Sequence, residues 1–236
     1  MEKVLLITGA SGGMGKALSH FFAAQGYTLA LHFHRNEVSL PESEKVAHFK
    51  ADLTNEREVE ILVAAVLQRF GRIDVLINNA GISRSGMSWK TSSGDWRETM
   101  AINLDAPFYL SKAVIPGMRQ QKGGRIINIT SVVAQTGFIG TAAYAASKAG
   151  LIGLTKTLSK ELISSGISVN ALALGYFEVG MINDVPDDVR RQVIDTIPAK
   201  ELGKPETVFA TIEWLISDAA AYVTGQTINL NGGLYS

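Results

Sequence analysis

A regular alternation of short apolar runs with longer stretches of helical periodicity constrains this chain more than any other feature. Residues 4–7 are apolar, 14–25 have helical spacing, and 28–33 are apolar again. The pattern continues with strands expected at 46–49, 73–77, 125–129, 167–172 and 226–230, and helices expected at 56–70, 95–121, 142–164 and 206–217. Strands this apolar, separated by helices, belong to parallel sheets covered on both faces. We therefore expect a doubly wound α/β fold with one seven-stranded parallel sheet and helices on both faces.

The composition indicates a folded core and excludes several classes of function. Hydrophobic residues make up 46% and charged residues 19%, which is too apolar for a disordered chain. The 22 lysines and arginines balance 22 aspartates and glutamates, so no basic excess favours nucleic acid. The absence of cysteine excludes disulfides, thiolate metal sites and a cysteine nucleophile. We expect no metal site.

No segment suggests export or a membrane. The longest apolar run, 61–67, is far shorter than the ~20 residues that cross a bilayer, and the first residues do not resemble a signal peptide. We therefore expect a cytoplasmic protein with neither a membrane nor nucleic acid as partner.

The alternation has no obvious linker or internal repeat, so we expect one domain over residues 1–236. Its most irregular part, about 175–204, combines prolines with a charged stretch at 187–191. A position between a strand and a helix favours a substrate lid, and a solvated connector helix is the alternative.

A glycine-rich turn, TGASGGMG at 8–15, follows the first expected strand. Open α/β sheets bind ligands beyond the carboxyl ends of their strands, and glycines let backbone amides at a helix N-terminus approach a pyrophosphate. The spacing differs from G-x-G-x-x-G, so the nucleotide interpretation depends on the position between strand and helix, and a purely structural turn is the alternative. The candidate cofactor-binding residues here are Gly9, Ser11, Gly12, Gly13, Met14 and Gly15.

Polar residues follow the third and fourth expected strands as well. Asp52, with Leu53 beside it, stands where a carboxylate could accept a hydrogen bond from an adenine amino group, but the same sequence suits a helix cap. Asn79, Ala80 and Gly81 form a tight polar turn that could contact the cofactor and hold neighbouring strands together.

Tyr144 and Lys148 stand four residues apart on an expected helix and so share one face. Ser131 follows the fifth strand thirteen residues earlier, and Asn103 lies on the preceding helical segment. These four side chains could converge at one edge of the sheet, and the alternative is a set of unrelated surface and capping residues.

Taken together, these motifs resemble the short-chain dehydrogenase/reductase family. The matching residues are TGASGGMG at 8–15, NNAG at 78–81, Asn103, Ser131 and YAASK at 144–148, in the family's order and approximate spacing. The C-terminal stretches IPAKELGKPE and AAYVTGQTINLNGGLY are similar to those of bacterial 3-oxoacyl-[acyl-carrier-protein] reductases and acetoacetyl-CoA reductases. The resemblance implies a Rossmann fold, a nicotinamide cofactor and a step of fatty acid biosynthesis.

The resemblance also implies a mechanism, the reduction of a 3-oxoacyl thioester of acyl carrier protein or CoA. Tyr144 would donate a proton to the alkoxide, and Ser131 would hold its oxygen. Lys148 would lower the tyrosine pKa from about 10 towards 7, worth about 4 kcal/mol, and bind the nicotinamide ribose together with Tyr144. Asn103 would anchor a water that resupplies protons. Another small ketone, alcohol or polyketide substrate is the first alternative, and a catalytically weak NADP-binding module is the second.

The end of the second strand bears on the choice of cofactor. No carboxylate stands there before Glu37, and Arg35 could pair with a 2′-phosphate, so NADP(H) is favoured over NAD(H). Many NADP-using relatives carry a basic residue where this chain has Gly13, so the preference depends mainly on Arg35.

Two residues depart from the family's pattern. Leu174 stands where relatives usually have proline, and Val179 replaces a threonine that contacts the nicotinamide carboxamide. The backbone at Gly175 is still expected to bind the carboxamide. The apolar residues Phe177, Met181 and Ile182 suit either an acyl group or packing within the lid.

The resemblance further implies a homotetramer, formed through long helices and C-terminal strands. Small and apolar residues on the Tyr144 helix, namely Ala145, Ala149, Gly153 and Leu154, suit close packing between copies or on the chain's own sheet. Reductases that use acyl carrier protein tend to place basic residues near the active-site mouth, and Arg119, Lys122 and Arg125 are the candidates. We expect His32 and His34 to be strand or adenosine-side residues.

Overall fold

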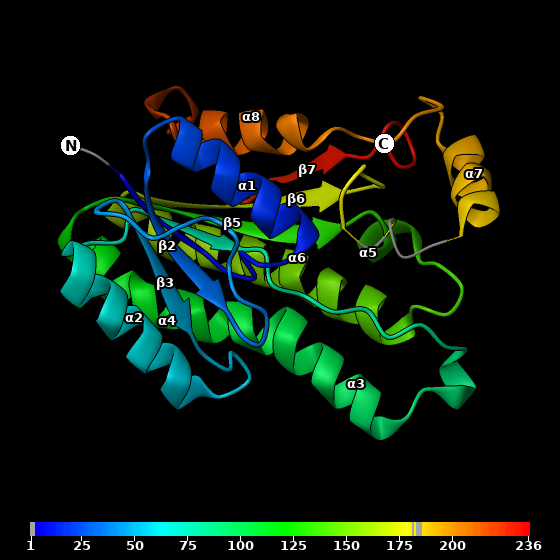
Figure 1. Cartoon of the computed structure of the whole chain (residues 1–236), viewed down its shortest axis with the longest axis horizontal. Coiled ribbons are helices and arrows are strands. Elements are labelled where there is room, and N and C mark those ends of the chain that lie inside the picture. The colour runs from blue at the N-terminus through cyan, green and yellow to red at the C-terminus, as the bar shows by residue number, and fades with distance from the viewer. Residues whose placement is uncertain (1–2, 181, 183–185) are drawn as a thin grey trace.

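The computed structural model describes residues 3–180, 182 and 186–236. Within these residues, seven parallel strands form one sheet in the order β3-β2-β1-β4-β5-β6-β7 (Figure 1). The strands are β1 (Val4–Ile7), β2 (Thr28–Phe33), β3 (Val46–Lys50), β4 (Val75–Asn78), β5 (Gly124–Ser131), β6 (Ile167–Leu174) and β7 (Thr227–Leu230). The predicted doubly wound α/β fold is confirmed.

Helices cover both faces of this sheet (Figure 1). One face packs against α1 (Gly13–Ala24) and α8 (Pro205–Ile216). The other face packs against α2 (Glu56–Phe70), α4 (Ala106–Gln120) and α6 (Ala142–Leu162). Other helices in the described part of the chain are α3 (Ser93–Met100), α5 (Val133–Thr136), α7 (Asp187–Thr196), a π-helical segment (Ala101–Asp105) and 3-10 turns at Ser88–Lys90, Ile163–Ser165 and Asp218–Ala220.

The inner strands are almost entirely apolar because helices cover both faces of the sheet. Successive side chains of a strand point to opposite faces, so Leu5 joins the cluster around Phe22 of α1, and Leu6 joins the one around Val66 of α2. Both leucines are completely buried. A sheet exposed to water on one face would need a polar residue at one of these positions.

The helical region expected at 95–121 is divided in two by the π-helical segment. The side chain of Ser92 caps α3 by accepting a hydrogen bond from the Asp95 amide. The chain then passes through Ala101–Asp105 into α4. A π-helical turn contains an extra residue, and such turns are frequent at functional sites. Here it carries the fully buried Asn103.

The segment 175–204 lies partly beyond the strand ends, where α7 stands past the arrowheads of β6 and β7 (Figure 1). Phe177 is buried in the cluster under α1 and α8, and Ile182 packs with Ile197 and Leu202. Packing within the segment therefore accounts for these two apolar residues, whereas Met181 lies outside the described residues. The lid interpretation and the single-domain organisation stay predictions. Across the described ranges, no helix is long and apolar enough to cross a membrane.

Candidate active site

The candidate residues gather where the parallel strands end. Ile7 pairs with Ile77 at the ends of β1 and β4, so Thr8 lies beside Asn78 and contacts the turn that begins with Asn79. Ser131 pairs with Leu174 at the ends of β5 and β6. The shared direction of the strands thus brings chain segments from 8 to 175 to one edge of the sheet.

The glycine-rich turn is a close-packed cradle at the start of α1. Gly9 has a left-handed φ of 65°, and an added Cβ would lie 2.9 Å from the Ala80 Cα. A Cβ at Gly15 would collide with the Gly9 carbonyl oxygen and lie 2.7 Å from the Asn79 Nδ2. Gly12 caps the helix without a side chain, and the first amides of any α-helix have no acceptor within the helix. These free donors and the positive end of the helix fit a pyrophosphate.

The NNAG turn after β4 holds this cradle in place. The Thr8 hydroxyl oxygen accepts hydrogen bonds from the Asn79 and Ala80 amides, each 3.0 Å long. The Asn79 Nδ2 donates to the Thr8 carbonyl oxygen at 2.8 Å. One residue earlier, the Asn78 Nδ2 donates to the Asn128 Oδ1 at 2.8 Å, inside the sheet. The motif therefore has a structural role as well as a position suited to the cofactor.

The Asp52 side chain forms a turn with Thr54 and is not the N-terminal cap of α2. Its Oδ1 accepts hydrogen bonds from the Thr54 amide at 2.9 Å and the Thr54 hydroxyl at 2.7 Å, while Asn55 caps α2. These bonds lower the pKa of the Asp52 carboxyl. The adjacent Leu53 side chain is buried, which leaves only its backbone for a ligand.

His32 joins the glycine turn to the end of β3. Its Nδ1 accepts a hydrogen bond from the Gly9 amide at 3.2 Å, and its Nε2 lies 3.1 Å from the Ala51 carbonyl oxygen. The residue is 2% exposed, and burial lowers the pKa of His32 to about 4. The sequence placed His32 on the strand or near adenosine without revealing these contacts. Its only signal was a histidine within an otherwise apolar strand.

Ser131, Tyr144 and Lys148 form a second group at the same edge. The Ser131 side chain lies near enough to Tyr144 to influence the pKa of its phenol. The Lys148 Nζ lies 5.9 Å from the centre of the Tyr144 ring and donates a 2.8 Å hydrogen bond to the Ile129 carbonyl oxygen. The start of α6 lies beside the end of β5, where the Thr130 hydroxyl donates to the Lys148 carbonyl oxygen at 3.0 Å.

The pKa values of Tyr144 and Lys148 are both shifted from their ordinary values. Burial raises the pKa of Tyr144 above its ordinary value, and the nearby Ser131 side chain opposes this only partly. The expected lowering by Lys148 is therefore wrong for this structure, because the ammonium group is bonded to Ile129 rather than to the phenol. Burial lowers the pKa of Lys148 to about 8, so the side chain is mostly charged at neutral pH.

Asn103 lies against this group through the loop after β4. Its Oδ1 accepts a hydrogen bond from the Ile82 amide at 2.9 Å, and its Nδ2 donates to the Ile82 carbonyl oxygen at 2.9 Å. The Nδ2 also donates to the Ser147 hydroxyl at 3.1 Å, one residue before Lys148. Its role as an anchor for a water molecule stays a prediction.

Comparison with known proteins agrees with this arrangement. Residues 3–190 match the short chain dehydrogenase family. The chain belongs to that family. It is therefore an oxidoreductase with the family's Rossmann-like fold, and membership implies a nicotinamide cofactor.

Relatives of this short-chain dehydrogenase align along nearly its whole length. A 3-oxoacyl-[acyl-carrier-protein] reductase of Thermotoga maritima is 41% identical over 239 residues, which are 98% of this chain and 97% of the relative. One from Staphylococcus epidermidis is 38% identical over 243 residues and covers both chains completely. Nodulation protein G of Rhizobium sp. is 40% identical over 233 residues, 97% of this chain and 95% of the relative.

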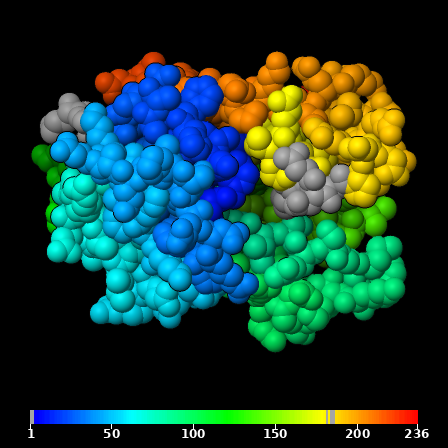
Figure 2. Space-filling view, in the orientation of Figure 1, coloured from blue at the N-terminus to red at the C-terminus, as the bar shows by residue number. Residues whose placement is uncertain are grey.

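The segment after β6 touches the glycine turn. A Cβ added at Gly13 would lie 2.5 Å from the Cα and the amide nitrogen of Gly180, so this conformation leaves no room for a side chain at position 13. In Figure 2 the yellow surface of this segment meets the dark blue surface of the N-terminal part of the chain. Val179 and Met14 pack on the same apolar cluster. The contact supplies a physical reason for glycine at position 13.

Gly175 is equally constrained. Its amide donates to the Leu230 carbonyl oxygen at 2.8 Å, and a Cβ would lie 2.7 Å from the Asn231 Cα. The carbonyl of Gly175 is therefore the backbone group left for a carboxamide. The Leu174 carbonyl oxygen accepts a hydrogen bond from the Val132 amide at 2.8 Å, which joins this segment to the end of β5.

The three basic residues expected near the active-site mouth lie away from the site. Arg125 pairs with Val75 and Ser168 at the amino ends of the strands. It stands six positions before Ser131, about 20 Å along a strand. Arg119 and Lys122 lie at the end of α4 and in the turn that leads into β5. The expectation is therefore wrong within a single chain, because a strand begins and ends at opposite edges.

His32 makes the stability of the fold depend on pH. Its pKa is about 4 in the folded chain and ordinarily 6.5, and the hydrogen bond to Ala51 and the charge of Asp52 offset burial and His34 only in part. Between these values the unfolded chain binds a proton that the folded chain does not, so acid favours unfolding. We expect this group alone to lower the free energy of unfolding by about 2 kcal/mol from pH 7 to pH 5.

Urea denaturation at both pH values measures this effect. His32→Asn removes the titrating group, so its loss of stability on acidification is expected to be about 2 kcal/mol smaller than that of the wild type. Equal losses in the two proteins would mean that His32 is not held neutral in the folded state.

Proposed function

We propose that this dehydrogenase is an NADPH-dependent reductase of 3-oxoacyl thioesters, carried by acyl carrier protein or CoA. The observation that carries the proposal is the group of Ser131, Tyr144 and the buried Lys148, whose Nζ lies 5.9 Å from the Tyr144 ring centre, at the same edge as the glycine cradle. The named activity of the Thermotoga and Staphylococcus relatives supports the choice of substrate.

In the proposed reaction, some residues bind the cofactor and others transfer the proton. The first amides of α1 would hold the pyrophosphate, and the Asp52 carboxylate would hold the adenine. When bound, the reduced nicotinamide supplies a hydride. Tyr144 donates its phenol proton to the oxygen of the former carbonyl, while the Ser131 hydroxyl hydrogen-bonds that oxygen. The charged Lys148 would bind the nicotinamide ribose, and Asn103 would hold a water that returns the proton.

Exposed apolar side chains favour an acyl group over a sugar. Phe138 is 61% exposed and Ile139 is 79% exposed, and both stand just before the first turn of α6, which carries Tyr144. The Gly86 amide donates to the Gly140 carbonyl oxygen at 2.9 Å, which joins this loop to the one after β4. Met87 is exposed in that second loop. An apolar rim of this kind suits a hydrocarbon chain.

The first test follows oxidation of NADPH with acetoacetyl-CoA. We expect turnover by the wild type, and Tyr144→Phe should lower kcat by a factor of about 100 or more because the proton donor is lost. The variant keeps the fold, so its dissociation constant for NADPH should change by less than about threefold. Absorbance measures turnover, and cofactor fluorescence measures binding.

The pattern of results separates the proposal from its alternatives. Binding of NADPH without reduction of any thioester would reject the acyl substrate and favour another ketone or alcohol of the same family. Binding without reduction of either class would indicate a binding module. The proximity of Ser131 to Tyr144 and the charged Lys148 argue against that last interpretation.

Arg35 is the proposed determinant of NADP(H) preference. It is exposed just beyond β2, close enough to Asp52 for its charge to help lower the pKa of that carboxyl. Arg35→Ala should raise KM for NADPH about tenfold or more and leave KM for NADH within about twofold, because only NADPH carries the 2′-phosphate. Steady-state kinetics with both cofactors measure the difference.

Arg57→Ala is the matched control, since Arg57 is an exposed arginine on α2 that pairs with Glu60. It should change neither constant. Equal losses for NADPH and NADH in Arg35→Ala would show that Arg35 does not recognise the phosphate.

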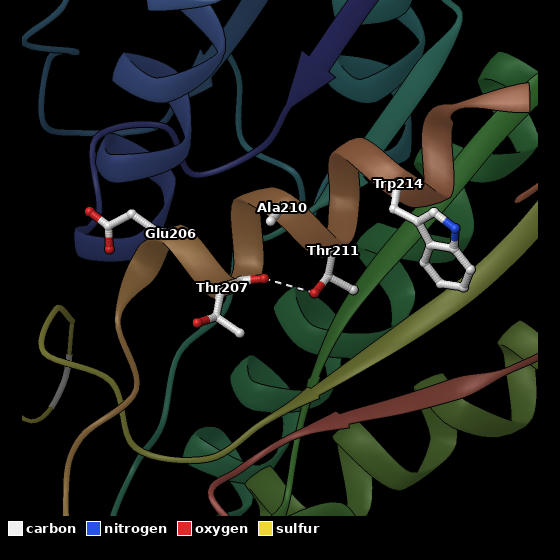
Figure 3. Close-up of a pocket in the computed structure, with 5 residues that line it drawn as sticks. All are labelled: Glu206, Thr207, Ala210, Thr211 and Trp214. Atoms are coloured by element: carbon white, nitrogen blue, oxygen red, sulfur yellow. Dashed lines mark hydrogen bonds between the residues drawn. The ribbon is translucent and has the colours of Figure 1, made fainter. Parts of the chain in front are cut away.

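We propose in addition that the chain forms a homotetramer that covers α8 and the β7 edge. A shallow surface depression lies along α8 and is lined by Thr207, Ala210 and the 44% exposed Trp214 (Figure 3). At the sheet edge, the Thr227 Oγ1 and the Asn229 Oδ1 are buried without a hydrogen-bond partner among the described residues. A second copy would supply partners for these groups.

A second surface on α6 suits the other contact of a tetramer. Ala149 and Gly153 are exposed there, which allows close approach of another helix. Leu154 instead packs on the chain's own sheet. Two distinct surfaces on each chain are what a tetramer with twofold axes requires.

Ala210→Arg places a long charged side chain in the α8 depression. We expect this variant to dissociate into dimers, whereas Ile61→Arg, on an exposed position of α2, remains a tetramer. Light scattering coupled to size-exclusion chromatography measures the mass. A tetramer in both variants would exclude α8 from the interface, and a monomeric wild type would reject the tetramer.

A further inference from the structure

His32 lies between the two segments that are proposed to hold the adenosine diphosphate half of the cofactor. On one side its Nδ1 is 3.2 Å from the Gly9 amide nitrogen, and its carbonyl oxygen accepts from the Ala10 amide at 2.9 Å. On the other side its Nε2 is 3.1 Å from the oxygen of Ala51, the residue before Asp52. One residue of β2 thus contacts both the glycine turn and the turn that carries Asp52.

The hydrogen-bond partners determine the state of the ring. The Gly9 amide can only donate, so the Nδ1 must hold a lone pair and the proton must lie on the Nε2. The Nε2–H then donates to the Ala51 carbonyl oxygen. A charged ring would have no acceptor for Gly9, and the nearly complete burial of His32 disfavours charge as well. His34 and Asp52 are the charged or titratable groups that act on the ring.

The hydrogen bond from the Gly9 amide to His32 lies at the residue whose backbone conformation determines how the glycine turn begins. Gly9 has a left-handed φ of 65° and begins the turn. Its carbonyl oxygen accepts from the Gly12 amide at 3.1 Å and the Asn79 Nδ2 at 3.3 Å, so the two polar groups of this residue are bonded on opposite sides. A rotation of the Gly9 backbone would turn the following amides away from the pyrophosphate.

We infer that His32 is a positioning residue for cofactor binding, whose neutral ring sets the distance between the glycine turn and the Asp52 turn. It does not touch the reacting atoms. Its effect is therefore confined to the adenosine diphosphate half of the cofactor and leaves the group of Ser131, Tyr144 and Lys148 unchanged. The inference depends on the proposed cofactor site but not on the proposed thioester substrate.

Two substitutions test the two contacts. His32→Leu removes both. His32→Asn keeps an acceptor for the Gly9 amide, because the Oδ1 of asparagine and the Nδ1 of histidine are both bonded to Cγ. The asparagine side chain is too short to reach Ala51. His48→Leu is the matched control, because His48 lies on the neighbouring β3 and its Nε2 has no hydrogen-bond partner among the described residues.

The probes are NADPH and 2′-phospho-ADP-ribose, which lacks the nicotinamide. We expect His32→Leu to weaken both by the same factor, about tenfold, from the loss of one to two hydrogen bonds. At saturating NADPH its kcat should stay within about twofold of the wild type, and His32→Asn should recover most of the affinity. Calorimetry measures the dissociation constants, and melting temperature in the absence of cofactor measures the fold.

Wild-type affinity in a folded His32→Leu variant would overturn the inference, as would a loss of kcat at saturating cofactor. A similar loss of affinity in His48→Leu would also overturn it, because the effect would not be specific to His32. A wild type that binds neither NADPH nor NADH would instead reject the proposed function, so the two failures are distinguishable.

Nitrogen NMR of the wild type supplies a test that does not need any variant to fold. At neutral pH the His32 ring should show a protonated Nε2 and an unprotonated Nδ1, with no exchange to the charged form. A proton on the Nδ1 would leave the Gly9 amide without its acceptor and would overturn the inference.

Discussion

The hydroxyl of Thr8 is the contact on which the arrangement of the site depends. It accepts hydrogen bonds from two successive amides after β4, while the Asn79 side chain donates back to the backbone of the glycine turn. The turns after β1 and β4 are thereby locked together at the point where the order of strands reverses. The close approach of Gly9 to Ala80 is possible only because residue 9 lacks a side chain.

Burial governs the chemistry of the other half of the site. Lys148 is held inside the protein by a carbonyl oxygen of β5, and its pKa falls to about 8, while the pKa of the neighbouring Tyr144 rises. Both shifts favour the neutral forms of the two side chains. The tyrosine therefore keeps its proton at neutral pH in this structure.

Several features of the fold were predictable because they depend on local periodicity. The strand at 28–33 and the helix at 56–70 have the predicted boundaries, since apolar spacing and turn residues define both ends. The division of the helix near Asn103 was not predictable, because a π-helical turn has the same composition as the helix around it. The position of Arg125 was misjudged, because nearness to Ser131 along a strand does not mean nearness in space.

The sequence by itself determined the sheet, the glycine turn and the family, because each depends on residue types at fixed spacing along the chain. Only the tertiary structure decided what His32, Asn103 and Lys148 bond to, because their partners lie on other strands and loops at positions that no local pattern encodes. It also decided that Gly13 faces the segment after β6. Packing between distant segments sets such contacts, and with them the protonation and orientation of the groups at the site.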